Sequence, residues 1–133
     1  MNNLTVAYQG GIKFEAMAGK HNLTIDLPPE KGGTDAGMAP PDLFVASLGS
    51  CIGVYVVRYC QNAKIDAEGC VISLDWRLSD DKKSIAAVEV KVRLPKADPG
   101  PRARAILEAA RSCLIHNTLH GGLNVDITLE SAR

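Results

Sequence analysis

The residues in this sequence best able to do chemistry are its four cysteines, Cys51, Cys60, Cys70 and Cys113. Cys51 and Cys60 share one expected helix, on opposite sides and about 13 Å apart, which is beyond disulfide reach. Cys70 begins an expected strand, where a lone thiol is most often a small core hydrophobe. Cys51 and Cys113 are both expected on buried sides of helices, so they could meet across the core as a redox pair. Spacing alone does not show that they meet, and two inert core thiols are the alternative.

Cys113 also begins a pattern that could bind a metal. Cys113, His116 and His120 form C-x-x-H-x-x-x-H, which suits zinc if one helix carries all three. No fourth ligand is evident, and two glycines follow His120 at once. We therefore expect no metal, and we expect both histidines to be polar residues at a helix end.

The segment that carries Cys51 predicts a long helix over residues 40–62. Two prolines and Asp42 suit its first turn, where an acid favours the positive end of the helix dipole. From Leu43 to Val57 there is no charged side chain and no polar face, so this helix must be buried all round. It is too short and too rich in Ser and Gly to predict a membrane span.

Alternating apolar residues predict strands on both sides of this helix. Residues 4–27 read as a three-stranded meander whose first turn is the two-residue pair Gly10-Gly11. Residues 28–39 are a loop by composition, either functional or a mobile connection. After the helix, residues 71–78 and 88–94 predict two long strands joined by a polar turn.

The last third of the chain predicts one more helix and one more strand. Apolar residues at spacings of three and four after residue 99 indicate an amphipathic helix with Cys113 on its apolar side. Gly121-Gly122 ends this helix, and alternation over residues 123–129 predicts a final strand. The order of elements indicates an α+β fold, with antiparallel sheets wrapped on helices in one domain over residues 1–133.

Length, charge and composition limit the possible functions. The 133 residues are few for enclosing a helix that is buried all round, which favours a dimer. Fifteen basic and fifteen acidic residues give a net charge of zero with no basic stripe, so neither nucleic acid nor an anionic membrane is an expected partner. Four cysteines without a secretory signal favour free thiols in the cytoplasm.

Two motifs resemble a known family. The segment G-M-A-P-P-D-L-F-V-A-S-L-G-S-C, which ends at Cys51, resembles the signature of the OsmC/Ohr family (osmotically induced protein C and organic hydroperoxide resistance protein). The segment R-S-C-L-I-H-N-T-L, which contains Cys113, is similar to that family's second cysteine motif. The interval between the cysteines and the order of elements fit the family over essentially the whole chain.

This resemblance implies an intertwined homodimer with sheets around central helices, and a cysteine-based peroxidase chemistry without a cofactor. Cys51 would attack an organic hydroperoxide as a thiolate and become a sulfenic acid. Cys113 would resolve it as a disulfide, and a dithiol such as a lipoyl group would restore both thiols. These steps agree with general thiol chemistry.

The sequence departs from the hydroperoxide-resistance members at two charged positions. Those members carry an Arg in the amino-terminal strands and a Glu just before the helix, whereas here no Arg precedes Arg58 and the Glu position is Pro41. The match is thus better to the broader OsmC-like group. Lys13, Lys20 and His116 remain candidates for activating Cys51. The alternative function is a non-catalytic dimer that binds a small apolar ligand between sheet and helices.

Overall fold

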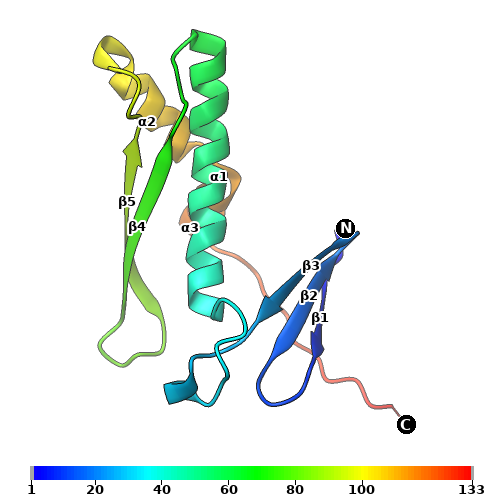
Figure 1. The fold of residues 1–133 in the computed structure, drawn as a ribbon. Coiled ribbons are helices and arrows are strands. Elements are labelled where there is room, and N and C mark those ends of the chain that lie inside the picture. Colours follow the sequence, from blue (N-terminus) through cyan, green and yellow to red (C-terminus); the bar gives the residue numbers. More distant parts are fainter. Residues whose placement is uncertain (1, 133) are drawn as a thin grey trace. The chain divides into compact units, whose positions relative to one another are not determined.

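The computed structural model describes residues 2–132. The chain divides into two compact units, with the boundary between Ser47 and Leu48. The first unit holds a small sheet and a loop. The second holds a hairpin and the shorter helices, and the long helix α1 (Pro40–Ala63) begins in the first unit and continues into the second (Figure 1).

The first unit confirms the predicted three-stranded meander. Strands β1 (Thr5–Tyr8), β2 (Phe14–Ala18) and β3 (His21–Ile25) pair antiparallel in the order β1-β2-β3. The predicted two-residue turn at Gly10-Gly11 is wrong. Tyr8 pairs with Phe14, so residues 9–13 form a longer connection in which the Gln9 amide donates to the Lys13 carbonyl at 2.9 Å. Both glycines adopt positive φ there, a backbone region that glycine enters without a steric penalty.

The loop between β3 and α1 is organised by a buried carboxylate. Asp26 is almost completely buried, and its oxygens accept hydrogen bonds from the Leu27, Thr34 and Ala36 amides and from the Thr34 hydroxyl. The Leu27 amide and Thr34 hydroxyl, with the other donors, lower the pKa of Asp26 to about 2. The loop also contains one short 3-10 helix, η1 (Pro29–Lys31). Of the two interpretations of residues 28–39, a freely mobile connection therefore does not fit.

Helix α1 has 24 residues and buries one face within the chain. Its most buried residues recur at spacings of three and four, and are Val45, Leu48, Ile52, Val56 and Cys60. Phe44, Val54 and Arg58 are exposed, so the prediction of burial on every face is wrong for the single chain. The helix is also long and apolar enough to cross a membrane by length and composition alone, contrary to the estimate from its sequence. A core helix passes the same test, and the buried stripe on α1 is that of a core helix.

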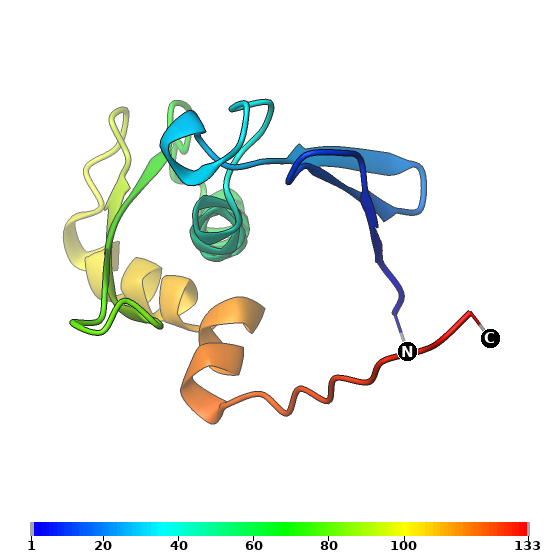
Figure 2. The same ribbon diagram turned by 90° about the horizontal axis from the view of Figure 1, so that it is seen from below.

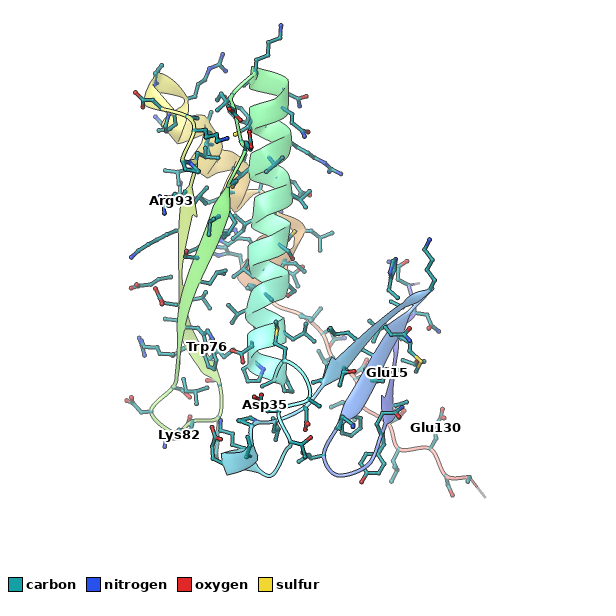
Figure 3. The ribbon with its side chains drawn as sticks, in the orientation of Figure 1. Glu15, Asp35, Trp76, Lys82, Arg93 and Glu130 are labelled. Atoms are coloured by element: carbon teal, nitrogen blue, oxygen red, sulfur yellow. The ribbon has the colours of Figure 1, made fainter. Side chains whose placement is uncertain are left out.

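The second unit packs a hairpin against this helix. Strands β4 (Val71–Leu78) and β5 (Ile85–Arg93) pair antiparallel as predicted, with Trp76 opposite Val88. Figure 3 shows Trp76 and Arg93 on the hairpin and Lys82 in its polar turn. A side chain at Gly49 would place its Cβ 2.6 Å from Leu74 Cδ1, so this glycine permits close approach of α1 to β4.

The predicted second helix is interrupted. A 3-10 turn, η2 (Gly100–Arg102), leads into α2 (Ala103–Arg111), and α3 (Leu114–Gly121) follows after a break at Ser112 and Cys113. Seen along α1, the hairpin lies on one side of the helix, while α2 and α3 lie along another side (Figure 2). The core they enclose consists of Leu48, Ile52, Val56, Cys60, Ile106, Ala110 and Cys113.

The final predicted strand does not form. Residues 122–132 have no regular structure and leave α3 as an extended tail (Figures 1 and 2). Ile127 and Leu129 are 90% and 98% exposed. An alternating segment becomes a strand only when a neighbouring strand offers hydrogen-bonding groups, and this segment pairs with no strand among the described residues.

Candidate active site

Two cysteines from different helices meet beside the core of the second unit. Cys51 lies on α1, one residue before the buried Ile52, and is half-buried against the core cluster that contains Cys113. Cys113 is 0% exposed. The prediction placed Cys113 within a continuous helix, but it lies at the N-cap of α3, in extended conformation. The structure therefore brings together two thiols that are 62 positions apart in the sequence.

Hydrogen bonds at the junction of α2 and α3 fix the place of Cys113. The His116 amide donates to Cys113 Sγ at 3.2 Å, which makes the sulfur the cap of α3. The His116 ring reaches back, its Nδ1–H donating to the Arg111 carbonyl at 2.7 Å, and the Asn117 side-chain amide donates to the Ser112 carbonyl at 3.3 Å. Side chains of α3 thus satisfy the last carbonyls of the preceding segment, so the chain can turn at Cys113 without leaving these groups unpaired.

The two thiols interact with each other. Burial, a hydrogen bond with Cys51 and the charge of Cys51 raise the pKa of Cys113, against the opposing effect of the His116 and Ile115 amides. Cys113 is thereby held as a protonated thiol at neutral pH. Cys51 is only half-buried, so solvent reaches Cys51 and not Cys113.

The other two cysteines form a second neighbouring pair with a different environment. Cys60 is fully buried near the end of α1, and Cys70 is half-buried just before β4. Burial and the charge of Cys70 raise the pKa of Cys60, and burial raises the pKa of Cys70. Both are therefore protonated at neutral pH, as expected of core thiols.

Among the described residues of the second unit, no charged side chain considered for activating Cys51 is bonded to its sulfur. Arg58 and Asp42 are exposed. Lys13 and Lys20 belong to the first unit, on the connection after β1 and on the turn before β3. The His116 ring is bonded to the Arg111 carbonyl and not to a sulfur.

The zinc pattern is not assembled. Within residues 2–132, no group of three or more His, Cys, Asp and Glu side chains comes close enough to hold a metal ion. The rings of His116 and His120 pack edge to face with centroids 4.6 Å apart, while the Cys113 sulfur is directed toward Cys51.

Sequence reasoning missed the helix break and the residues that stabilise it. The sequence predicts His116 as a polar residue at a helix end and as one candidate for activating Cys51, whereas in the structure its amide bonds the Cys113 sulfur. The signal available was the Ser112-Cys113 pair in mid-helix, because small polar residues favour cap positions over helix interiors. A cysteine cap with a backbone donor three residues later follows the usual N-cap spacing.

Comparisons with known proteins agree with this architecture. A family model described as OsmC-like protein matches residues 32–128. An uncharacterised protein of Methanocaldococcus jannaschii is 29% identical over 123 residues, which cover 88% of this chain and 63% of the relative's length. The chain thus spans somewhat under two thirds of that curated relative.

Solved structures resemble the fold at low sequence identity. A protein from Psychrobacter arcticus, described provisionally as an osmotic stress induced and detoxification response protein, has a TM-score of 0.80 at 19% identity, covering 89% of this chain and 88% of the other. An OsmC-like protein from Mycoplasma pneumoniae has a TM-score of 0.74 at 16% identity, covering 91% and 88%. An organic hydroperoxide resistance protein from Legionella pneumophila has a TM-score of 0.67 at 18% identity, covering 91% and 90%.

Proposed function

Because this chain belongs to the OsmC-like protein family, we propose that it is a thiol peroxidase that reduces organic hydroperoxides with Cys51 and Cys113. The observation that carries the proposal is the contact between these two thiols, one reachable by solvent and the other buried. The name of the similar Legionella protein, an organic hydroperoxide resistance protein, supports the substrate class.

The reaction begins at Cys51. Its thiolate attacks the outer oxygen of the hydroperoxide, the O–O bond breaks, and the alkoxide leaves and takes up a proton as the alcohol. The sulfur is oxidised by two electrons and becomes a sulfenic acid. Cys51 has the role of nucleophile because it is the half-buried member of the pair, whereas burial raises the pKa of Cys113.

Cys113 completes the first half of the cycle. Its sulfur attacks the sulfenic sulfur, a disulfide forms, and the hydroxyl leaves as water with the Cys113 proton. The contact between the side chains limits the movement needed for this step. A dithiol of the lipoyl class then exchanges with the disulfide, restoring both thiols and becoming oxidised itself. A reducing cytoplasm suits this cycle.

We also propose that the working protein is a homodimer. Along residues 123–129 the alternating apolar side chains are exposed, and α1 leaves Phe44 and Val54 exposed. A second copy would offer a strand for this segment and cover the open side of α1. Light scattering should give twice the mass of the chain, and a monomer at micromolar concentration would contradict the proposal.

A second candidate function rests on an apolar groove in the second unit. The groove lies between the end of β5 and α2, has a volume of about 200 Å³, and is lined by Val92, Leu94, Pro99, Ala103, Ile106 and Leu107. A non-catalytic ligand-binding dimer could use this place between sheet and helix. The groove is smaller than the roughly 300–1,000 Å³ of most ligand pockets, so the peroxidase is the better-supported function.

The test is a hydroperoxide assay. Purified protein is mixed with cumene hydroperoxide and dihydrolipoamide, and peroxide consumption is followed for the wild type and Cys51→Ser. We expect turnover in the wild type and at least a hundredfold loss in the variant, because a serine hydroxyl is not ionised at neutral pH. Equal consumption by both proteins, or none by either, would exclude this function.

Peptide mapping gives a second readout. After one equivalent of hydroperoxide without reductant, we expect a disulfide between Cys51 and Cys113, while Cys60 and Cys70 remain free. Four free thiols, together with a bound apolar ligand, would favour the ligand-binding alternative.

A further inference from the structure

We propose that the first unit contains a binding site for a small oxyanion, a phosphate or a carboxylate, that also carries a hydrogen-bond donor. The site is a cavity of about 300 Å³, with residues 9–13 on one side and Asp26 and residues 32–34 on the other. This volume reaches the lower end of the range of most ligand pockets. All of these residues lie in the first unit, so the proposal does not depend on the cysteines.

The connection between β1 and β2 offers free backbone donors to this cavity. The Gly10 carbonyl accepts from the Lys13 amide at 3.0 Å, and the Gly11 carbonyl accepts from the Tyr8 hydroxyl at 2.9 Å. By contrast, the amides of Gly10, Gly11 and Ile12 donate to no protein group within residues 2–132. Both glycines have positive φ, and successive free amides in a turn can form a concave binding place for an anion.

Lys13 adds a positive charge to the same side of the cavity. The residue is half-buried. In the described part of the chain, the ion pairs join Lys96 to Glu68 and Arg111 to Glu108, and Lys13 has no carboxylate partner. An unpaired ammonium beside free amides favours a negatively charged ligand, because hydrogen bonds from these donors are stronger to an ionised acceptor.

The opposite side of the cavity carries a buried carboxylate. Asp26 Oδ2 accepts three hydrogen bonds, from the amide and hydroxyl of Thr34 and from the Ala36 amide. Asp26 Oδ1 accepts one, from the Leu27 amide at 2.8 Å. A Cβ at Gly33 would lie 2.7 Å from Oδ1, so this glycine lets the loop backbone close on the carboxylate. Oδ1 therefore keeps a lone pair that a donor on the ligand can use.

The two sides of the cavity together define the class of ligand. The free amides and Lys13 favour an oxyanion, whereas the negative charge of Asp26 disfavours an anion that has no hydrogen to donate. Phosphate at neutral pH carries a hydroxyl and satisfies both conditions, and so does a hydroxycarboxylate such as lactate. Sulfate has the shape of phosphate but no hydroxyl, so it is the matched control ligand.

The experiment is an NMR titration of the full chain labelled with nitrogen-15, at neutral pH and constant ionic strength. Inorganic phosphate, lactate and sulfate are added separately, and sodium chloride is the salt control. We expect phosphate, lactate or both to shift the amide signals of Gly10, Gly11 and Ile12 to saturation, which distinguishes a phosphate from a carboxylate ligand. Sulfate should bind at least about tenfold more weakly, because its contact with Asp26 lacks a hydrogen bond to a charged group.

Two variants test the role of Lys13. Lys13→Gln removes the charge at the cavity, and Lys20→Gln removes an exposed charge from the turn between β2 and β3, outside the cavity. We expect Lys13→Gln to weaken binding at least about fivefold and Lys20→Gln to change it by less than about twofold. The spread of amide signals shows whether each variant is folded, and the comparison of phosphate with sulfate needs no variant.

Three results would overturn the proposal. The first is that phosphate and lactate shift the Gly10, Gly11 and Ile12 signals no more than sodium chloride does. The second is equal affinity for sulfate and for the ligand that binds. The third is equal weakening in Lys13→Gln and Lys20→Gln, which would mean that the anion responds only to the general surface charge. None of these measurements involves a hydroperoxide or a cysteine, so this site and the proposed peroxidase stand or fail separately.

Discussion

The second unit contains two pairs of neighbouring thiols, and the pairs differ in what surrounds the sulfur. Cys51 and Cys113 meet where a helix begins, and the His116 amide points at the buried sulfur. Cys60 and Cys70 meet where α1 ends and β4 begins, and burial raises the pKa of both. Burial and proximity are common to the two pairs. The difference lies in the backbone N–H groups at the start of α3. These groups oppose the rise in the pKa of Cys113, whereas no backbone donor opposes the rise in the pKa of Cys60 or Cys70.

The comparison suggests why one pair of thiols would react and the other would not. A thiol buried without donors keeps its proton and behaves as a small apolar residue. A thiol that receives backbone N–H groups can in turn support a charge on its neighbour. The reactive pair is therefore expected where a backbone N–H at the start of a helix reaches a sulfur, as at Cys113, and the inert pair where burial acts without such a donor.

The largest expected effect is a difference in hydroperoxide turnover between a variant of the first pair and a variant of the second. Cys113→Ser should keep the first reaction of Cys51 with hydroperoxide but lose at least tenfold in steady turnover with dihydrolipoamide, because no second thiol resolves the sulfenic acid. The matched variant Cys60→Ser should retain turnover within about twofold. Mass spectrometry should find Cys51 as sulfinic acid only in Cys113→Ser. Similar losses in both variants would mean that the two pairs do not differ in function.

An intermediate effect is expected in thiol labelling. At pH 8, Cys60 and Cys70 should react with iodoacetamide at least about tenfold more slowly in the folded protein than after denaturation, since burial raises the pKa of both thiols and limits access. The direction is fixed by the sign of the shift: a raised pKa lowers the thiolate fraction, and labelling should recover only as the pH rises. Labelling of either residue at the denatured rate would contradict the inert character of this pair.

Much of the fold could be predicted from alternating apolar residues and from the glycines, prolines and polar residues that mark turns. The meander, α1 and the hairpin follow from local patterns, because each strand has a neighbour close in sequence. The tail over residues 123–129 has the same alternation, but a strand also needs a partner, which no local pattern supplies. The prediction that α1 is buried on every face was wrong for the same reason, since an apolar composition does not say which chain covers each side.

The candidate site was predictable in its residues and not in its geometry. The family resemblance pointed to Cys51 and Cys113, and the structure brings them together. The break between α2 and α3 was missed because its stabilisation comes from groups reaching backward, namely the His116 ring and the Asn117 amide. A pattern of apolar spacing continues through such a break, because Cys113 is buried in either geometry.

The smallest expected effect concerns stability and tests whether the second pair serves only in packing. Cys60 is 0% exposed within the core cluster, whereas Cys70 is half-buried outside it. Cys60→Ala should therefore lower the free energy of unfolding by about 1–2 kcal/mol, measured by urea denaturation, and Cys70→Ala by less than about 1 kcal/mol. Hydroperoxide turnover should remain unchanged in both variants. A loss of turnover in either variant without a matching loss of stability would give the second pair a chemical role and remove the distinction between the two pairs.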